Sequence, residues 1–324
     1  METAQKSFRI LSIDGGGVRG IIPARILQAF EEITAKPISK IFDLIVGTST
    51  GGLIALGLTY GDSAKQPKFS AKEIVNIYLN HSPQIFSRSL LHTLITGAGL
   101  WGAKYSRDPL DKMLNSLFST GLLSQAICPV IVPTYSLIKG LPNLFMSHKS
   151  DPNTADYFIR DVAGATNSAP TYFPPKEFTD SLGNIHIEAD GGIFANNPEV
   201  IGVTEAYSLD PKLNRQDIEL ISIGTGSPKL AESSHNLINA GVIGWVMKAN
   251  LIDLMIDANS AWTTEEISTL YSTKAKRLQI PLPARLAALD NASSENLHSL
   301  LEAAESYIHT NFQMLSDLIN PYKR

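Results

Sequence analysis

The stretch FRILSIDGGGVRGIIPARILQAFEEITAK, residues 8–36, carries the pattern that decides the fold. Its first part, residues 8–14, is a short apolar run that ends in an aspartate before three glycines, which predicts a buried strand. Residues 21–36 follow with apolar side chains at helical spacing, which predicts an amphipathic helix. The pair then repeats, because residues 42–47 form a second apolar run and residues 50–60 a second helical pattern. Two successive strand–helix units predict right-handed crossovers, and hence a three-layer α/β/α fold with a mostly parallel central sheet.

Later segments continue the α/β pattern. Strands are predicted at residues 128–137, 184–190, 218–226 and 276–283, and helices at 71–80, 108–117, 155–166, 198–208 and 294–318. We expect residues 1–230 to form a catalytic domain. Residues 231–324 are expected to form a mostly helical region packed on the same domain, since no clear linker separates the two parts.

The composition restricts the class of protein and its partners. With 324 residues, 44% of them apolar and 18% charged, the chain is predicted to be globular with a large core. Its 27 basic and 31 acidic residues are close to balance, which argues against a nucleic-acid partner. Cys128 is the only cysteine and the seven histidines are scattered, so neither a disulfide framework nor a cysteine-rich metal site is expected. The sequence carries no signal for an oligomeric state.

The location expected from the sequence is cytoplasmic. The first residues, METAQKSFRILSID, lack the basic-then-apolar pattern and the cleavage site of a secretory signal. No stretch reaches the roughly 18 consecutive apolar residues of a membrane span. Peripheral association with a membrane, and secretion by a route that uses no such signal, stay open.

The segment VGTSTGGL places Ser49 between Gly47 and Gly51, at a predicted strand-to-helix turn. A G-x-S-x-G sequence in this context is typical of a nucleophile elbow, where the glycines let the backbone turn sharply. The start of the following helix also offers unpaired N–H groups and a partial positive charge. The alternative is an ordinary tight turn, so the nucleophile interpretation requires a proton acceptor and a set of oxyanion donors.

The glycine-rich loop after the first strand, SIDGGGVRGIIP, allows two interpretations. Gly15, Gly17 and Gly20 form a G-x-G-x-x-G pattern between a strand and a helix, as in dinucleotide-binding sites. Such a site needs an acidic residue at the end of the second strand to bind a ribose. Glu31 and Glu32 instead fall within the first predicted helix, which argues against a nucleotide site.

The same glycines suit an oxyanion hole. The backbone N–H groups of Gly15, Gly16 and Gly17 can point at one oxygen because no Cβ stands in the way. Parallel topology would bring the carboxyl ends of both strands to one edge of the sheet, which would place this loop opposite Ser49. Arg19 either fixes the shape of the loop or adds positive charge, and a solvated surface arginine is the alternative.

The proton acceptor must come from elsewhere in the chain. His298 and His309 lie in a long helical pattern without a nearby loop signal, which favours surface positions on a helix. His186 lies in a predicted strand four residues before Asp190, and alternation makes it a possible neighbour of that acid rather than the base. Asp190 ends the strand before Gly191, at the sheet edge, where an aspartate could accept the serine proton directly. An ordinary aspartate, with a pKa near 3.9, is a weak base, so the oxyanion donors would have to lower much of the barrier.

Together these stretches closely resemble the patatin-like phospholipases. That family pairs an Asp-Gly-Gly-Gly-x-Arg-Gly loop with Gly-x-Ser-x-Gly and a later Asp-Gly-Gly or Asp-Gly-Ala. The three motifs here are Asp14–Gly20, Gly47–Gly51 and Asp190–Gly192, and further likeness lies in residues 165–175, 195–198 and 222–226. The resemblance spans about residues 8–228 and rests on three rare motifs in the right order and spacing.

The resemblance implies a serine acyl hydrolase with a Ser-Asp dyad and no histidine. The implied site comprises Ser49 and Asp190 as catalytic residues, Gly15, Gly16 and Gly17 as the oxyanion hole, and Arg19, Gly47, Gly51 and Gly191 as supporting residues. It further implies lipid degradation, in which acyl esters of phospholipids, lysophospholipids or neutral glycerolipids are cleaved through an acyl-serine intermediate. The family's catalysis needs no metal, and we expect no cofactor.

Two apolar segments could bind the acyl chain or touch a membrane. They are residues 84–105, which are poor in acids, and residues 236–256, and ordinary core helices are the alternative for both. Two other functions stay open at this point. One is a nucleotide-dependent oxidoreductase built on the Gly15–Gly20 loop, and the other is a non-catalytic lipid-binding module that keeps the fold.

Overall fold

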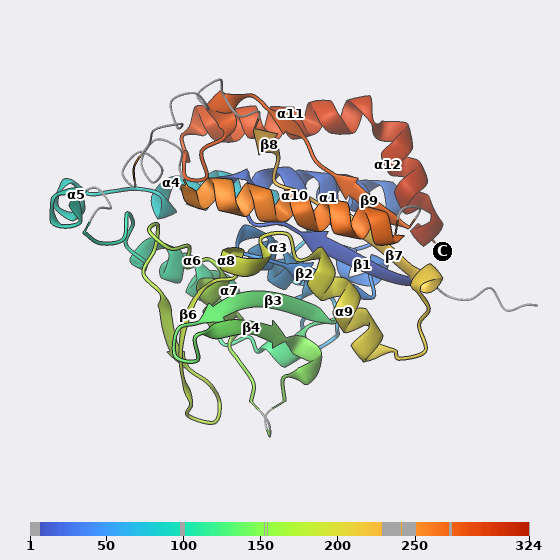
Figure 1. The fold of residues 1–324 in the computed structure, drawn as a ribbon, viewed down its shortest axis with the longest axis horizontal. Coiled ribbons are helices and arrows are strands. Elements are labelled where there is room, and N and C mark those ends of the chain that lie inside the picture. The colour runs from blue at the N-terminus through green and yellow to red at the C-terminus, as the bar shows by residue number, and fades with distance from the viewer. Residues whose placement is uncertain are drawn as a thin grey trace, which may run out of the picture.

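The computed structural model describes residues 7–97, 101–151, 153, 155–228, 241, 251–271 and 274–323. Within these residues an eight-stranded mixed sheet lies between two layers of helices (Figure 1). Its strands are β1 (Phe8–Ile13), β2 (Leu44–Gly47), β3 (Val130–Ser136), β4 (Leu141–Met146), β5 (Lys176–Thr179), β6 (Ile185–Asp190), β7 (Ile218–Ile223) and β9 (Ala275–Leu278). A separate pair is formed by β8 (Ser227–Pro228) and β10 (Pro281–Leu282). The helices are α1 (Ile21–Thr34), α2 (Ile38–Ile41), α3 (Thr50–Thr59), α4 (Ala71–Ile85), α5 (Leu90–Ile95), α6 (Asp108–Phe118), α7 (Ile159–Thr166), α8 (Gly192–Ala195), α9 (Glu199–Leu209), α10 (Leu251–Tyr271), α11 (Ser294–Thr310) and α12 (Phe312–Ile319).

The order across the sheet is β5-β6-β3-β2-β1-β7-β9, with β4 paired to β3. Five neighbouring strands, β3, β2, β1, β7 and β9, run parallel to one another. The strands β4 and β6 pair antiparallel with β3, and β5 pairs antiparallel with β6. The predicted three-layer α/β/α architecture is confirmed, and its antiparallel part is confined to one side of the sheet.

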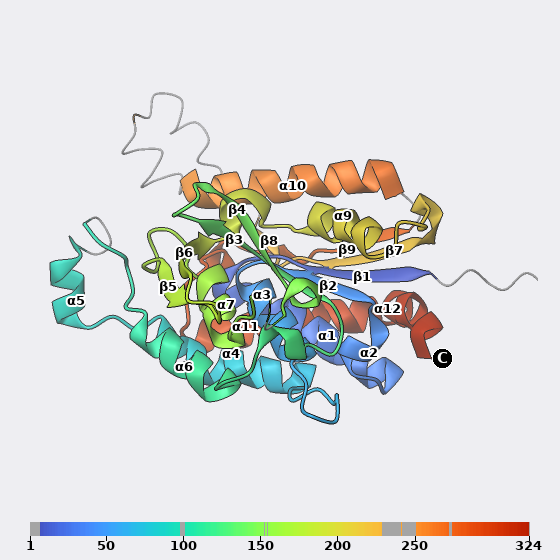
Figure 2. The same cartoon turned by 90° about the horizontal axis from the view of Figure 1, so that it is seen from below.

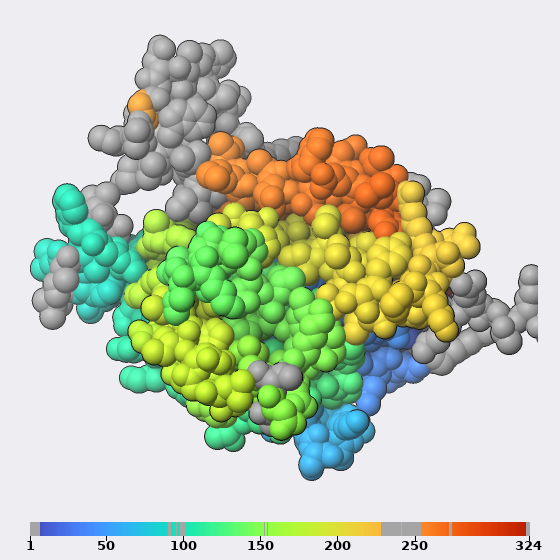
Figure 3. Space-filling model, turned by 60° about the horizontal axis from the view of Figure 1, so that its bottom comes forward, coloured from blue at the N-terminus to red at the C-terminus, as the bar shows by residue number. Residues whose placement is uncertain are grey.

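The first strand is buried on both faces, which accounts for its continuous apolar run. Leu11 and Ile13 pack into the core formed with α1, α3 and α4, and Ile10 packs into the core formed with α9 and α10. Figure 2 shows these two helical layers on opposite sides of the sheet. In Figure 3, α10 (orange) lies along the outer surface with α9 (yellow) beside it.

Several elements differ from the sequence prediction. The strands β4 and β5 are not predicted, because both are partly exposed and β4 contains Pro142 and Asn143, which are poor strand formers. The predicted strand at 276–283 consists of two short strands, β9 and β10. The predicted helix at 294–318 is divided at Asn311 into α11 and α12.

The strands β2 and β6 meet end to end along one flank of β3. Ile131 of β3 pairs with Val46 of β2 and, on its other flank, with β4. Thr134, further along β3, pairs with Asp190 of β6 and again with β4. Because β4 occupies one flank in both places, β2 and β6 share the other flank and run toward each other. The last residues of these strands, Gly47 and Asp190, therefore face one another.

The C-terminal part of the chain adds to the sheet and to both helical layers. The strand β9 extends the sheet by parallel pairing with β7. The helix α11 packs on α1, where Arg25 and Glu305 form an ion pair at 2.6 Å, and α10 packs against α8 and α9. Residues beyond 250 thus share a core with the first 230 residues.

Candidate active site

Ser49 lies at the sharp turn between β2 and α3. Its backbone has a φ of 55° and a ψ of −123°, a positive φ that residues with a side chain rarely adopt. The helix begins so close to the sheet that a Cβ at Gly51 would lie 2.2 Å from the carbonyl oxygen of Ile13. A Cβ at Gly47 would approach the carbonyl oxygen of Gly51 equally closely. Two of the three predicted supporting glycines, Gly47 and Gly51, are therefore required by the close packing of this turn.

The backbone of Ser49 is held by side chains at the end of α7. Its N–H group donates to Thr166 Oγ1 at 2.8 Å, and the Thr166 hydroxyl donates to the carbonyl oxygen of Pro133 at 2.8 Å. Asn167 Nδ2 donates to the carbonyl oxygen of Ser49 at 3.2 Å. Thr166 and Asn167 lie in the 165–175 stretch. The likeness of that stretch to the family is the signal that the sequence offers for them, and it does not indicate their role.

Asp190 is buried and contacts Ser49. Its carboxylate accepts a hydrogen bond from the N–H group of Gly192 at 2.7 Å. Burial raises the pKa of Asp190 to about 7, and the interactions of the carboxylate with the Ser49 hydroxyl and with the Gly192 N–H group offset the effect of burial only in part. A carboxylate that titrates near neutral pH accepts a proton far better than an ordinary aspartate. The structure thus brings together the two residues predicted to form the dyad, while their catalytic roles stay a prediction.

The glycine loop presents two backbone donors to the site. Gly16 and Gly17 line the cavity beside the serine, and within the described chain their N–H groups make no hydrogen bond. Gly17 has a φ of 57°, and a Cβ on it would lie 2.1 Å from the carbonyl oxygen of Leu289. Gly15 differs, because its N–H group donates to the carbonyl oxygen of Asn196 at 3.0 Å. The N–H group of Gly15 is therefore already used to anchor the loop, and the predicted oxyanion-hole role stays a prediction that the N–H groups of Gly16 and Gly17 fit better.

A cavity of about 330 Å³ opens over Ser49 and Asp190. Its wall is largely apolar and includes Phe86, Tyr172, Phe173, Ile193, Met255 and Leu289. The amide side chains of Asn167, Asn196 and Asn259 also line it, and Asp190 is the charged residue among the described residues in this lining. A cavity of this kind can hold an apolar chain next to the serine.

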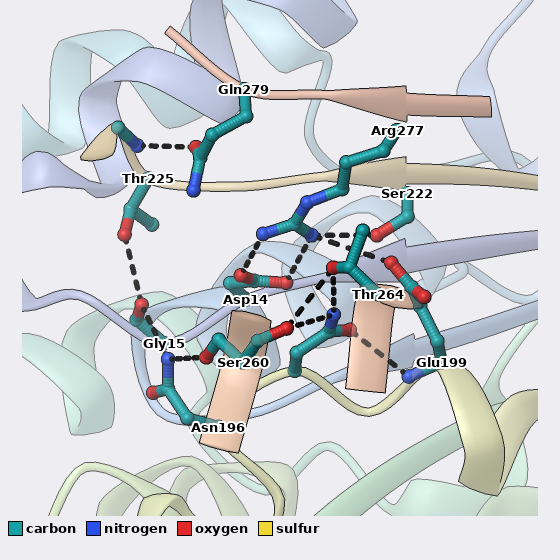
Figure 4. A network of polar contacts seen from close by, with 12 residues as sticks. Asp14, Gly15, Asn196, Glu199, Ser222, Thr225, Ser260, Thr264, Arg277 and Gln279 are labelled. Carbon is teal, nitrogen blue, oxygen red and sulfur yellow. Dashed lines mark hydrogen bonds and ion pairs between the residues drawn. The ribbon is translucent and has the colours of Figure 1, made fainter. Parts of the chain in front are cut away.

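A buried polar network lies behind the glycine loop (Figure 4). Asp14, the last residue before the glycines, accepts two hydrogen bonds from Arg277 of β9, at 2.7 and 2.5 Å. The same guanidinium donates to Ser222 Oγ at 2.7 Å and lies 3.6 Å from Glu199 Oε1. Burial raises the pKa of Asp14 and of Glu199, and the charge of Arg277 acts against it. Nothing in the sequence pattern pointed to Arg277, since it contacts Asp14 only through the tertiary structure.

Arg19 is buried, with 4% of its surface exposed, so the alternative of a solvated surface arginine is wrong. It lies in the short 3₁₀ turn that follows the glycines, at residues 17–20. Its charge joins that of Arg277 in lowering the pKa of Asp14 against the larger effect of burial.

The histidines considered for the site lie elsewhere. His298 and His309 are exposed on α11, as predicted. His186 contacts Asp180 Oδ2 at 3.1 Å, and its ring stacks on that of Phe178 at a centroid distance of 4.9 Å. The expectation that His186 neighbours Asp190 is wrong, because residues four apart along a strand are separated by about 13 Å.

The acids considered for a nucleotide ribose have other roles. Glu31 accepts hydrogen bonds from the backbone N–H groups of Ile38 and Ala71, at 3.1 and 2.8 Å, and so connects three segments of the helical layer. Glu32 is exposed on α1, and its carboxylate lies 3.6 Å from Arg25. The end of β2, where a ribose-binding acid would stand, leads instead into Ser49.

Residues 84–105 do not form one helix. The helix α4 ends at Ile85, and the short helix α5 stands out at one end of the molecule (Figures 1 and 3). At the base of this segment the rings of Phe86 and Tyr105 pack edge to face, 5.3 Å apart. Further out, Leu94 and Trp101 are 79% and 85% exposed.

Most of the second apolar segment, 236–256, lies outside the described residues, namely 236–240 and 242–250. Its described part consists of Gly241 and the start of α10, from which Met255 reaches the cavity with 62% of its surface exposed. Across the described part of the chain, none of the helices combines the length and the hydropathy needed to cross a bilayer.

Comparisons of the sequence with family profiles and with known proteins all lead to patatin-like proteins. The sequence profile described as patatin-like phospholipase matches residues 11–201, which include the glycine loop, Ser49 and Asp190. Patatin-like protein 1 of Arabidopsis thaliana is 33% identical over 339 residues, covering 92% of this chain and 81% of the relative. Patatin-like protein 2 of Oryza sativa subsp. indica is 29% identical over 346 residues, covering 94% of this chain and 85% of the relative.

Among solved structures, VipD from Legionella pneumophila aligns over 95% of this chain and 69% of its own, with 13% identity and a TM-score of 0.38. That likeness is too distant to inform the site. The profile match and the relative that is 33% identical over most of both sequences carry the assignment, and they show that the chain belongs to the patatin-like phospholipase family.

Proposed function

We propose that this chain is a lipid acyl hydrolase of the phospholipase A or lysophospholipase type, which cleaves carboxylic esters of membrane-derived lipids through an acyl-Ser49 intermediate. The observation that carries the proposal is the pairing of Ser49 with the buried carboxylate of Asp190, with both residues lining the same apolar cavity. The N–H groups of Gly16 and Gly17 beside that pair add the donors that acyl transfer requires. Membership of the patatin-like phospholipase family supports the general class of lipid hydrolase.

The proposed reaction has two half-reactions. In the first, the Ser49 oxygen attacks the ester carbonyl carbon while the Asp190 carboxylate takes the hydroxyl proton. The N–H groups of Gly16 and Gly17 stabilise the resulting oxyanion. As the carbon–oxygen bond to the leaving group breaks, Asp190 returns the proton to that oxygen, and the acyl group stays on Ser49. In the second half-reaction a water attacks the acyl carbon and gives one proton to Asp190. As the bond between the acyl carbon and the Ser49 oxygen breaks, Asp190 returns that proton to the serine oxygen, which releases the fatty acid and restores the hydroxyl and the carboxylate.

The cavity favours a substrate with an apolar chain next to the ester. Aromatic and aliphatic side chains such as Phe86, Phe173 and Met255 would contact the acyl chain. The amides of Asn167 and Asn259 can bond to the glycerol or ester oxygens. Phospholipids, lysophospholipids and neutral glycerolipids all meet these conditions.

We further propose that the protein binds membranes peripherally through the mouth of the cavity. Ile193 and Met255 both line the cavity and are strongly exposed. Leu94 and Trp101 are exposed on the protruding segment whose base, Phe86, also lines the cavity. Residues 84–105 contain no acidic side chain, so this segment does not repel anionic lipids. Tryptophan at such a position is typical of membrane interfaces.

A fluorophosphonate probe tests the proposed chemistry, because it reacts covalently with an activated serine. We expect labelling of the wild type at Ser49, no labelling of Ser49→Ala, and release of fatty acid from a panel of defined lipids only by the wild type. Asp190→Asn is expected to retain the fold and lose ester hydrolysis, and near-normal turnover by that variant would remove Asp190 from the mechanism.

The same measurement separates the alternatives. Quenching of fluorescence by a nicotinamide nucleotide, without labelling, would favour an oxidoreductase built on the Gly15–Gly20 loop. Retained binding of lipid, without labelling or hydrolysis, would favour a non-catalytic lipid-binding module.

A further inference from the structure

We infer that Arg277 is a positioning residue for the reaction, which fixes the glycine loop by holding Asp14. Arg277 lies on β9, outside the residues 11–201 that the family profile matches. The inference rests on the proposed function, because its consequence is the placement of the oxyanion donors Gly16 and Gly17.

The contact between the two side chains determines where the loop leaves the sheet. Asp14 directly follows β1 and directly precedes Gly15, and its carboxylate is almost fully buried. Both oxygens of that carboxylate accept from Arg277, at 2.7 and 2.5 Å. Two parallel hydrogen bonds between planar groups fix orientation as well as distance, which one hydrogen bond does not.

The guanidinium is itself held in place by the sheet. Arg277 of β9 pairs in register with Ser222 of β7, and Ser222 pairs in register with Ser12 of β1. Ser222 Oγ accepts a hydrogen bond from the guanidinium at 2.7 Å. The side chain of Arg277 therefore reaches across β7 to Asp14. Its starting point is fixed by the register of β9 on β7 and of β7 on β1.

The same guanidinium also lies next to the segment that covers the loop. Glu199, whose Oε1 is 3.6 Å from Arg277, begins α9 shortly after Asn196. Asn196 accepts the N–H of Gly15 at 3.0 Å through its carbonyl oxygen, and its side chain donates to Ser260 of α10 at 3.0 Å. As Figure 4 shows, the guanidinium of Arg277 reaches both Asp14, at the end of the strand that leads into the loop, and Glu199, in the segment that lies on the loop.

A displacement of this loop would act directly on the chemistry. A Cβ at Gly15 would lie 3.2 Å from the Cβ of Ser49, so the loop runs immediately beside the nucleophile. Misplacement of reacting groups by about 1 Å can lower a rate by about 100-fold. Lysine in place of Arg277 would keep the positive charge between the buried acids but could not make the two-point contact.

The test compares Arg277→Lys with Arg9→Lys. Arg9 makes a similar two-point contact with Asp43, at 3.0 and 3.3 Å, at the opposite end of β1 and away from the site. Hydrolysis of a soluble short-chain ester is measured, and rates are divided by the concentration of sites titrated with a fluorophosphonate. For Arg277→Lys we expect kcat per titrated site to fall by about ten-fold or more, with KM changed by less than about two-fold. For Arg9→Lys we expect both values to stay at the wild-type level.

Two results would overturn the inference. One is an Arg277→Lys enzyme with wild-type kcat per titrated site. The other is a variant that only yields fewer titratable sites, which would mean a purely structural role. If Arg277→Lys does not fold, Ser222→Ala removes one support of the guanidinium, and an unchanged kcat in that variant overturns the inference as well.

A double-mutant cycle tests whether Arg277 acts through Asp14. Since both residues belong to one contact, Asp14→Asn combined with Arg277→Lys should be about as slow as the slower single variant. Multiplied effects of the two substitutions would contradict an action through Asp14. A wild-type protein that neither reacts with the probe nor hydrolyses any ester would count against the proposed function, which distinguishes that failure from a failure of this inference.

Discussion

The carboxylate of Asp14 and the guanidinium of Arg277 form a two-point ion pair between residues that are 263 positions apart in the sequence. The strand β9, which carries Arg277, is the edge strand of the central sheet beside β7. Through Arg277, this C-terminal edge strand therefore contacts the residue that precedes the glycine loop beside Ser49. Because α10 contributes the contact of Ser260 with Asn196, two separate C-terminal elements support this loop.

The raised pKa of Asp190 predicts the pH dependence of the reaction. The group must be ionised to accept the serine proton, and burial raises its pKa to about 7. We expect kcat/KM for a soluble ester to rise about ten-fold per pH unit below pH 7 and to level off above it. A pH profile from 4 to 9 checks this, with fluorophosphonate labelling of Ser49 followed over the same range. An acid limb near pH 4 in both profiles would contradict the prediction.

The same shift predicts the sign of a stability change. The folded protein holds the Asp190 proton with a pKa of about 7, above the ordinary value of 3.8. The resulting stabilisation is fully present below about pH 4 and is lost as the pH rises through 7. Asp190→Asn cannot ionise, so between pH 4 and 9 its free energy of unfolding should rise relative to that of the wild type by about 4 kcal/mol. Urea unfolding of both proteins at several pH values measures this, and a difference that does not vary with pH would refute it.

The space around each glycine predicts different effects of substitution by alanine at Gly17 and Gly140, which both have a positive φ. Gly17 has a φ of 57° and no room for a Cβ, whereas Gly140 has a φ of 65° and no atom within 4 Å of a built Cβ. Gly140→Ala should cost about 1–2 kcal/mol of stability and leave hydrolysis per titrated site unchanged. Gly17→Ala adds a clash with Leu289 and would move the proposed oxyanion donor, so kcat should fall about 100-fold or more. Similar kcat values for the two variants would show that Gly17 does not position a donor.

The parts of the fold that could be predicted are those determined by local pattern. Residues 8–14 and 42–47 show apolar runs because β1 and β2 are buried on both faces. The strand β5 could not be found in the same way, since its four residues are largely polar and partly exposed. Its position depends on pairing with β6, which is a contact of the tertiary structure.

The sequence places Asp190 near Ser49 for a reason that the structure changes. Parallel strands end at one edge of a sheet, which predicts that the two residues meet, yet β6 runs antiparallel to β3. The two residues meet because β6 occupies the flank of β3 that β2 leaves free. The roles of Thr166 and Arg277 could not be predicted, because each depends on hydrogen bonds between segments that are distant in the sequence.

The exposed apolar side chains of the protruding segment predict where the proposed contact with a membrane lies. Leu94 and Trp101 stand on the protruding segment, and removal of both in Leu94→Ser/Trp101→Ser should weaken binding to lipid vesicles by about ten-fold or more. Trp262→Ser provides the matched control, because this tryptophan of α10 is 65% exposed and its indole donates to Glu266. Co-sedimentation with vesicles of zwitterionic lipid, with and without anionic lipid, measures the binding. Hydrolysis of a soluble ester should stay unchanged in both variants, since neither alters the cavity floor. Equal loss of vesicle binding in the two variants would show that exposed tryptophan in general, rather than the protruding segment, contacts the bilayer.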